Sequence, residues 1–477
     1  MIARLITAHK PDHDRMVGLH QRYKCSLAGV PIFTRKFLDQ TKINAQLNND
    51  FFSDIIDTKV GYFLGIPITY SYMEPEKDPE TGEPIATELQ TKKMVDQKLS
   101  DFVRRENVPE VDAEASKFAA ICGYGARLCY IGTDGEEHIE NAYPWECIFL
   151  VDDNDIQRPE YAVRYWEEAT GDKDQKTVIK AEFYDSTTIT YFRQDKSADN
   201  QPVGLSFSPD PEESPNPRPH MFAECPLLGF PNNNEMQGDC EKVLSLIDAY
   251  DRTLSDVNSE LEQMRLAYML IYGVGKIDDE FMEQVKKTGA IGFEAPINEG
   301  GGDARFIEKN LNVQAVEAHL DRLCNDIYYF AGSPNFRDQA FAGNISGVAL
   351  KFKLFKLESK CITAEREITT ALRQMFRVIG EKWKIEEVPF DPDRVEFQFK
   401  RNFPLNLQDE AQTTSMLRGQ ISEKTRLGLL SFIEDPEAEL MEMDKDNAKM
   451  AAGLLGEEGE DAQPGDEEDD TGGVTSE

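Results

Sequence analysis

The sequence predicts an α+β fold whose first half is rich in strands and whose second half is built from long helices. Between about residues 125 and 230, short runs alternate apolar and polar side chains, which is the period of a half-buried strand. From residue 243 onward, apolar residues recur at alternating spacings of four and three, which is the period of packed helices. Because 477 residues exceed one ordinary compact core, we expect several structural units.

The strand-rich region is predicted to begin with a hairpin. Ala126–Ile131 and Glu136–Ile139 lie on either side of Asp134 and Gly135, and Asp-Gly favours a tight turn between two strands. Further strands are predicted at Tyr161–Trp166, Val178–Tyr184 and Thr187–Phe192. Ser206–Pro219 contains five prolines and is predicted to be a loop. Antiparallel sheet should therefore dominate this part of the chain.

The residues before the hairpin predict helices. Asn48–Asp57 has the pattern of a helix start with an Asx cap, and an apolar stretch broken by glycine and proline follows it. Ala113–Gly125 has helical spacing and ends in a Gly-Tyr-Gly break. Glu74–Pro84 is rich in charge and proline, so a weakly ordered, solvated segment is expected there.

Three apolar seams predict three long helices in the second half. The first is Val243, Ile247, Tyr250, Leu254, Val257, Leu261, Met264 and Tyr268; the second is Val313, Val316, Leu320, Leu323, Ile327 and Phe330; the third is Leu350, Leu354, Leu357, Cys361, Ala364, Ile368, Ala371 and Met375. The second helix must end before Ser333-Pro334. Between the first two seams, Ala290–Phe293 and Ala304–Ile307 suggest a small β insert.

One seam alone would indicate packing within a single subunit. Three in succession, two of them bracketing a β insert, leave apolar stripes that one copy cannot easily bury. The pattern therefore favours side-by-side association of several copies.

The charge is strongly acidic. The chain holds 52 Lys and Arg against 88 Asp and Glu, a net charge of −36, which argues against wrapping nucleic acid on a basic surface. Gly456–Glu477 holds ten acids and no base, but the body is acidic as well. Lys351–Lys384 runs the other way with nine bases and four acids. It is interpreted either as a solvated helix face or as a contact to phosphate or to acidic neighbouring subunits.

Compartment signals are few. The eight cysteines form no Cys-x-x-Cys pair, so reduced and mostly buried thiols in a cytosolic protein are expected. Val60–Met73, the longest uncharged apolar-rich run, is shorter than a membrane-spanning helix needs, so no membrane span is expected. The first residues lack the pattern of a secretory signal.

No enzyme signature is present. The sequence lacks a phosphate-binding Gly-x4-Gly-Lys loop and a His-Glu-x-x-His motif. His9-x3-His13 contains Pro11, and Asp152–Asp155 lacks the glycine and the final glutamate of a calcium loop. Gly343–Gly347 only loosely resembles a nucleophile elbow, and Ser346 is interpreted as a helix cap. We therefore predict no catalytic residue, metal or cofactor.

Four stretches together resemble the portal, or head-to-tail connector, proteins of tailed double-stranded DNA bacteriophages of the siphovirus type. They are Asn49–Pro67; Gly123–Asp153 with its Tyr143-Pro-Trp-Glu146; Leu246–Tyr250 with Ser255 and Ala267-Tyr268; and Gly343–Leu350. The resemblance covers about residues 40 to 440.

The resemblance implies a portal fold with named parts. These are a mixed α/β wing (1–235), stem helix 1 (236–272), a small β-containing clip (273–312), stem helix 2 (313–332), a tunnel loop (333–347), the long wing helix and a strand (348–405), a helical crown (406–455) and a disordered acidic tail (456–477). It further implies a ring, usually of twelve subunits, at one capsid vertex of the virion, with the host cytoplasm as the place of assembly.

Double-stranded DNA would pass through this ring non-specifically during packaging and ejection. Other implied partners are the terminase large subunit, head-tail connector or adaptor proteins, and the major capsid and scaffolding proteins. The candidate channel residues are Asn335, Phe336, Arg337, Asp338, Gln339, Phe341 and Asn344. Lys351, Lys353 and Lys356 are candidates for contacts to phosphate or to a neighbouring subunit. Two alternatives remain open at this stage, a metal-dependent DNA-processing enzyme of a mobile element and a structural scaffold oligomer without a DNA role.

Overall fold

The computed structural model describes residues 1–36, 43–76, 78, 84–151, 155–169, 177–196, 202–264, 268–272, 283, 303–307, 312–337, 347–402, 407–430, 433, 436 and 439–447. The chain forms two compact units, residues 1–402 and 403–477. Each unit is described by itself.

Two antiparallel sheets occupy the strand-rich part of the first unit. The larger has the order β4-β5-β6-β7-β8, with β9 also paired to β7. Its strands are Cys147–Leu150, Tyr161–Ala169, Thr177–Tyr184, Thr188–Lys196, Pro202–Pro209 and Arg218–Pro219. The smaller has the order β10-β2-β3, with strands Leu227–Pro231, Tyr124–Ile131 and Glu137–Ala142.

Most of the strand predictions are confirmed. The hairpin around Asp134-Gly135 joins β2 to β3, and the three further strands correspond to β5, β6 and β7. The loop predicted for Ser206–Pro219 is wrong at both ends, because β8 extends to Pro209 and Arg218–Pro219 forms β9. β8 lies at the edge of its sheet, where a proline is tolerated since one side of the strand needs no hydrogen-bond partner.

Four helices precede or separate these strands: α1 (Ile2–Tyr23), α2 (Phe51–Leu64), α3 (Ala86–Arg105) and α4 (Val108–Cys122). The predicted Asx cap of α2 is confirmed, since the Asp50 side chain accepts from the Ser53 N–H. α4 ends at Gly123, whose φ is +103° and where a Cβ atom would lie 1.9 Å from the Met236 carbonyl oxygen. Only glycine fits this break. The pattern did not indicate α1 or α3, and part of Glu74–Pro84 lies outside the described residues.

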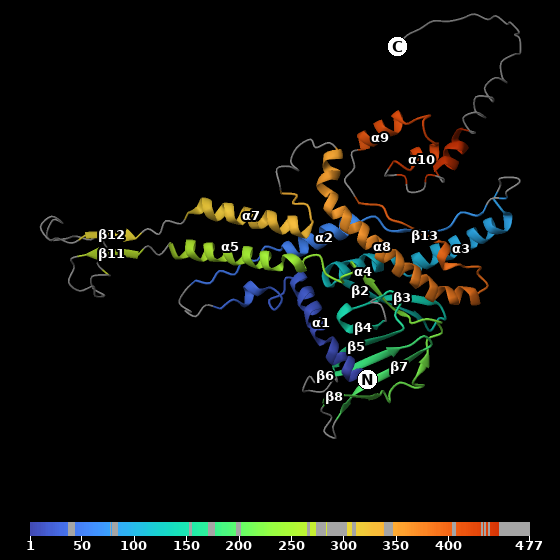
Figure 1. Ribbon diagram of the computed structural model, residues 1–477, viewed down its shortest axis with the longest axis horizontal. Helices are drawn as coiled ribbons and strands as arrows, with labels where there is room; N and C mark the ends of the chain where they lie inside the picture. Colours follow the sequence, from blue (N-terminus) through green and yellow to red (C-terminus); the bar gives the residue numbers. More distant parts are fainter. Residues whose placement is uncertain are drawn as a thin grey trace, which may run out of the picture. The chain divides into compact units, whose positions relative to one another are not determined.

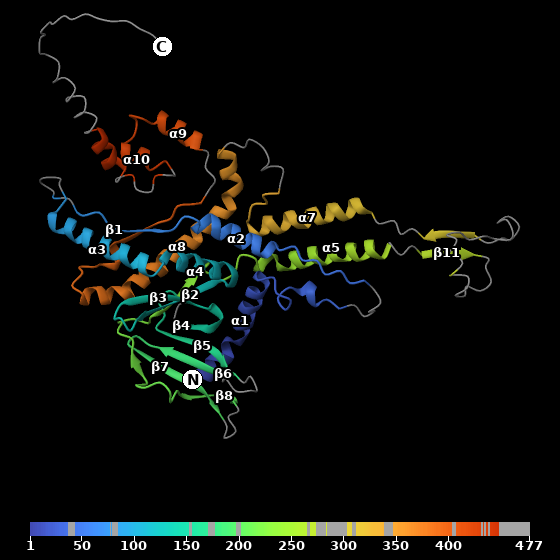
Figure 2. The same cartoon turned by 180° about the vertical axis from the view of Figure 1, so that it is seen from behind.

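The second half contains three long helices, α5 (Leu244–Met264), α7 (Val313–Ala331) and α8 (Gly347–Ile385). α5 and α7 lie side by side in both views (Figures 1 and 2). α7 ends at Gly332, with φ +69°, as predicted from Ser333-Pro334. α8 has 39 residues and is about 58 Å long at 1.5 Å per residue.

The prediction that the first stem helix continues through residue 272 is wrong. The described part of α5 ends at Met264, and Tyr268–Tyr272 forms β11, which pairs antiparallel with β12 (Asp303–Ile307). The run Tyr-Met-Leu-Ile-Tyr is continuously apolar and aromatic, so strand preference outweighs the helical spacing that Tyr268 happens to keep. The predicted strand at Ala304–Ile307 is confirmed, whereas Ala290–Phe293 lies outside the described residues.

One hydrophobic core joins the bases of α5 and α7 to the first half of the chain. It contains Val243 and Ile247 before and on α5, Ile327 and Ala331 on α7, and buried residues of α1, α2 and α4. β1 (Thr69–Tyr72) pairs with β13 (Val395–Gln398), and α8 packs by its third-seam residues, which are buried from Leu354 to Met375. The helical pair is therefore fixed at its base by residues far apart in the sequence.

The second unit contains α9 (Leu407–Met416) and α10 (Glu423–Leu427), where Ser422 caps α10. Both helices lie within 406–455, the range predicted as a helical crown, and 456–477 lies outside the described residues.

All eight cysteines are free thiols; six are buried and two are half-buried, so the expectation of mostly buried thiols is confirmed. Among the described residues, no helix combines the length and apolarity needed to cross a bilayer.

Candidate functional site

The first residues after α7, 333–337, are described by the structure. Ser333 and Pro334 are buried, and the Asn335 side chain is fixed because its Oδ1 accepts from the Arg337 N–H at 3.1 Å. Phe336 is 61% exposed and Arg337 is exposed, so both point away from the core. The other predicted channel residues, Asp338, Gln339, Phe341 and Asn344, lie outside the described residues, as does Ser346.

The start of α8 is both basic and aromatic on its exposed side. Lys351, Lys353 and Lys356 are exposed and alternate with Phe352 and Phe355, which are 77% and 68% exposed. We call these residues, together with Phe336, Arg337 and the exposed Tyr329 and Phe330 of α7, the loop-flanking surface.

Lys356 connects the two helices at this surface. Its Nζ donates to the Tyr329 carbonyl oxygen at 3.2 Å and lies 3.1 Å from the centroid of the Tyr329 ring. A cation over an aromatic face is attracted by the electron-rich ring, so Lys356 holds the start of α8 against the end of α7. The structure thus brings Lys356, one of the predicted contact residues, to the end of α7.

The rest of the basic stretch is largely neutralised within the chain. Lys360 pairs with Asp239 at 2.9 Å, Arg377 with Asp393 at 2.7 Å and Lys384 with Glu381 at 2.9 Å. Lys382 pairs with Glu386. Among the bases of this stretch, Lys351, Lys353 and Lys356 are the exposed ones at the start of α8.

A buried charge cluster lies beneath this surface. Lys59 of α2 donates to Asp239 at 2.7 Å and to Asn232 at 2.6 Å, and Lys360 of α8 donates to the other oxygen of Asp239. Burial disfavours the ionised carboxylate, but the two ammonium groups outweigh it and hold the pKa of Asp239 below its usual range. The sequence signal was a lysine inside the apolar run of α2, which sequence reasoning missed.

A second set of missed residues lies along α5. The extended segment before α2 donates three backbone N–H groups to side chains spaced four apart: Ala45 to Ser259 Oγ at 3.0 Å, Leu47 to Ser255 Oγ at 2.9 Å, and Asn49 to Asp251 Oδ1 at 2.9 Å. Four helical residues rise about 6.0 Å and two extended residues about 6.6 Å, so the spacings match. We call this set the α5 ladder. Its signal was a row of small polar residues recurring at every fourth position.

Asp251 has an unusual environment within the α5 ladder. Burial raises its pKa to about 6, and the neighbouring Asp248 adds to the rise, whereas the Asn49 N–H and Arg22 oppose it. The folded protein therefore binds a proton at Asp251 more tightly than the unfolded chain does.

Two groups of residues with side chains typical of metal ligands make contacts within the protein. Within the described residues, Glu136, Glu137 and Glu386 form a carboxylate cluster, but Lys98 lies 2.8 Å from Glu386 and Arg105 lies 2.8 Å from Glu137. In α1, His9 Nδ1 lies 2.9 Å from the hydroxyl of Tyr165, and burial lowers the pKa of His9 to about 4. Both are explained as structural contacts.

A pair of long helices whose connection holds a two-stranded sheet, rooted in the core of a β-rich unit, is the arrangement that the resemblance to phage portal proteins implies. Residues 2–452 match the family described as phage portal protein, SPP1 Gp6-like, so the chain belongs to this family. It is 24% identical to the portal protein of Bacillus phage SPP1 over 100% of this chain and 92% of the relative. It is also 24% identical to the portal protein of Clostridium phage phiCD119, over 86% of each chain.

We predict that Lys59→Met lowers the free energy of unfolding by about 3 kcal/mol, because Asp239 then loses a buried partner. Lys10→Met removes an exposed lysine, and a change within about 0.5 kcal/mol is expected. Urea unfolding at pH 7 measures both, and equal losses would contradict a structural role for the buried cluster.

Asp251→Asn should stabilise the protein in a pH-dependent way. The carboxyl is protonated in the fold below about pH 6 but ionised in the unfolded chain above about pH 4, so the wild type loses stability as pH rises between these values. The variant keeps the oxygen that accepts from Asn49 and lacks this loss. Its advantage should grow from near zero at pH 4 to about 1 kcal/mol at pH 7.

Denaturant unfolding across this pH range measures the effect. Asp256→Asn, at a more exposed carboxylate of α5, is the matched control and should show no such growth. A difference between Asp251→Asn and wild type that stays constant with pH would contradict the assignment.

Proposed function

We propose that this protein forms a ring, usually of twelve copies, at one vertex of the capsid, and that double-stranded DNA passes through the ring during packaging and ejection. The observation that carries the proposal is the loop-flanking surface, where an otherwise acidic chain exposes lysines and aromatic rings around the predicted tunnel loop. Membership of the portal family supports the same role.

The charge distribution suits passage better than binding. Each phosphate contact through a cation adds roughly one unit to the salt dependence of DNA affinity, so a uniformly basic wall would hold the duplex. A net charge of −36 per chain repels phosphate over most of the surface. The exposed bases Arg337, Lys351 and Lys353 then provide a few weak contacts that steady the duplex without arresting it.

Exposed apolar residues on the helical pair support assembly of copies. Leu261 of α5 and Val313 of α7 are 49% and 51% exposed, although both belong to predicted apolar seams. A neighbouring copy would cover large exposed apolar side chains that lie in the apolar stripe of a helix. In this proposal, residues 1–235 form the wing, and residues 313–332 together with the helix that ends at Met264 form the stem.

The remaining parts are assigned by position. The segment 273–312 is proposed to dock the terminase large subunit and later the head-tail connector proteins, and 406–455 to form the crown. The wing would meet the major capsid and scaffolding proteins. Assembly would take place in the host cytoplasm. No catalytic step is assigned to any residue.

Electron microscopy of the purified protein tests the ring. We expect closed rings with a central channel of about 20 to 40 Å, the scale set by a duplex and its grooves. Filaments or compact monomers would contradict the proposal, and metal-dependent DNA cleavage by the isolated protein would favour an enzyme instead.

The loop-flanking surface has a separate test in DNA packaging. Lys351→Ala with Lys353→Ala should leave rings intact but cause several-fold more DNA to slip out of partly filled heads, because contacts to phosphate are lost. The matched control is Arg366→Ala with Lys384→Ala, two exposed bases of α8 outside this surface. Deletion of residues 335–342 should act in the same direction. Unchanged packaging and retention in both would show that the surface does not touch DNA.

A further inference from the structure

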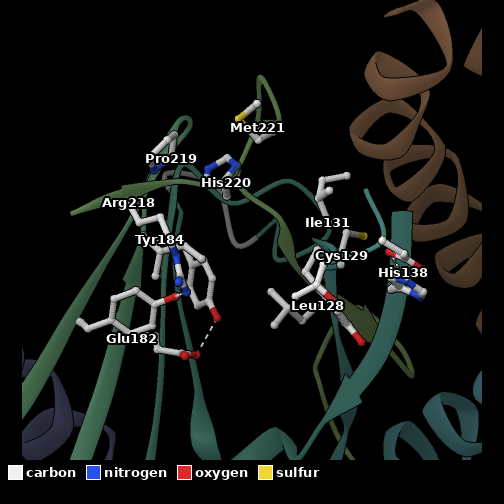
Figure 3. A pocket seen from close by; sticks show the side chains of 16 residues that line it. Leu128, Cys129, Ile131, His138, Glu182, Tyr184, Arg218, Pro219, His220 and Met221 are labelled. Carbon is white, nitrogen blue, oxygen red and sulfur yellow. Dashed lines mark hydrogen bonds and ion pairs between the residues drawn. The ribbon is translucent and has the colours of Figure 1, made fainter. Parts of the chain in front are cut away.

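A cleft in the strand-rich part of the first unit is not used by the proposed function. It has a volume of about 740 Å³ and lies between β2 with the turn that follows it and strands β6, β7 and β9 (Figure 3). Leu128, Ile131 and His138 form one wall, Glu182, Tyr184 and Arg218 the other, and Met221 lies at the rim.

The cleft contains a carboxylate with an available oxygen. Tyr184 donates its hydroxyl hydrogen to Glu182 Oε2 at 2.6 Å, the contact drawn in Figure 3, and no described residue donates a hydrogen bond to Oε1. Burial raises the pKa of Glu182; Tyr184 and Arg164 oppose the rise, and Glu140 and Glu213 add to it. A further cation at this carboxylate would therefore be stabilising.

Aromatic residues line both walls of the cleft. Tyr191 and the buried Tyr184 belong to one wall, and Tyr130 and His138, stacked with ring centroids 5.4 Å apart, belong to the other. The guanidinium of Arg218 lies 5.0 Å from the centroid of the Tyr191 ring. Because Arg218 already lies over the Tyr191 ring, the ring of Tyr130 and the carboxylate of Glu182 remain for the cation of a partner.

The rim is rigid but offers an adaptable apolar side chain. His220 is buried, with Nε2 at 3.0 Å from the Asp185 carbonyl oxygen and Nδ1 accepting from the Phe222 N–H at 3.2 Å. Between His220 and Phe222, Met221 has a φ of +70° and is 69% exposed. A left-handed backbone at a non-glycine residue is unfavourable and persists only where its neighbours fix it. A flexible methionine in this place suits contact with varied aliphatic groups.

The net charge of the residues around the cleft determines which charge a partner should carry. Residues 124–231 hold 21 acidic and nine basic side chains, so a basic partner is attracted to this region and an acidic one is repelled.

We propose that this cleft docks an extended basic segment of a partner protein. An arginine or lysine of that segment would enter the cleft beside Tyr130 and pair with Glu182, and an aliphatic neighbour would contact Met221. This interaction is independent of DNA passage and places a protein partner on the strand-rich region.

The test uses the purified full-length protein and a labelled peptide, acetyl-Val-Arg-Val-Arg-Val-amide, in fluorescence anisotropy. A peptide with glutamate at the two arginine positions is the charge control. Glu182→Gln keeps an oxygen for the Tyr184 hydroxyl but removes the charge, and Glu160→Gln removes an exposed carboxylate of the same region outside the cleft.

We expect the arginine peptide to bind the wild type, to bind Glu182→Gln about tenfold more weakly, and to bind Glu160→Gln with unchanged affinity. No binding to the wild type, equal binding of the glutamate peptide, or equal weakening by both substitutions would overturn the proposal. A benzophenone amino acid in place of Met221 gives a second readout, since it should crosslink to the arginine peptide but not to the glutamate peptide. Electron microscopy of each variant shows separately whether rings form, so failure of this proposal is distinguishable from failure of the ring.

Discussion

One buried carboxylate between two ammonium groups fixes how the long helices meet the rest of the first unit. Asp239 lies just before α5, Lys59 lies on α2 and Lys360 lies on α8, so a single residue ties three elements together. An ion inside a protein is tolerated only when its partners are well placed, so none of the three can move far alone. The hydrophobic core around Ile247 and Ile327 holds the same junction, but apolar contacts have little directionality. The ion pairs of Asp239 with Lys59 and Lys360 are directional, so they fix the orientation of the three elements.

The positions of the basic side chains decide where this acidic chain attracts phosphate and where it repels it. Four of the nine bases between Lys351 and Lys384 pair with carboxylates of the same chain, as Arg377 does with Asp393. Three exposed lysines, Lys351, Lys353 and Lys356, lie at the start of α8, where Phe352 and Phe355 are exposed as well. If the basic side chains were spread evenly, the whole surface would attract phosphate. Because they are clustered, most of the surface repels DNA. The cleft beside Glu182 follows the same logic with opposite sign, since there a local excess of carboxylates favours a cation.

Sequence periodicity predicted those parts of the fold that local patterns determine. The seams gave α5, α7 and α8, and Asp134-Gly135 gave the hairpin, because each signal lies within a few neighbouring residues. The end of α5 was misplaced because Tyr268 satisfies both a helical spacing and a strand-forming run. Lys59, Asp251 and the Glu182 cleft could not be recognised in this way. Lys59 and Asp251 act through partners more than a hundred residues away, Asp239 and Asn49, and the walls of the cleft come from strands that are not neighbours in the sequence. Pairing of this kind leaves no periodic trace. The tunnel loop at 333–347 stays a prediction from the family resemblance, and of its candidate channel residues the structure describes Asn335, Phe336 and Arg337.

The hydrogen bonds of the α5 ladder join two segments whose rise per repeat differs slightly. Each step gains about 6.6 Å on the extended segment against about 6.0 Å on the helix, so the offset reaches roughly 1.2 Å after two steps. A few more rungs would exceed the tolerance of a hydrogen bond, so the match is confined to a short run. A slip of one residue would turn alternate N–H groups away from Asp251, Ser255 and Ser259 together. The segment before α2 is therefore either held in one register or released as a whole. Its three hydrogen bonds form together only when α5 is in one position along that segment.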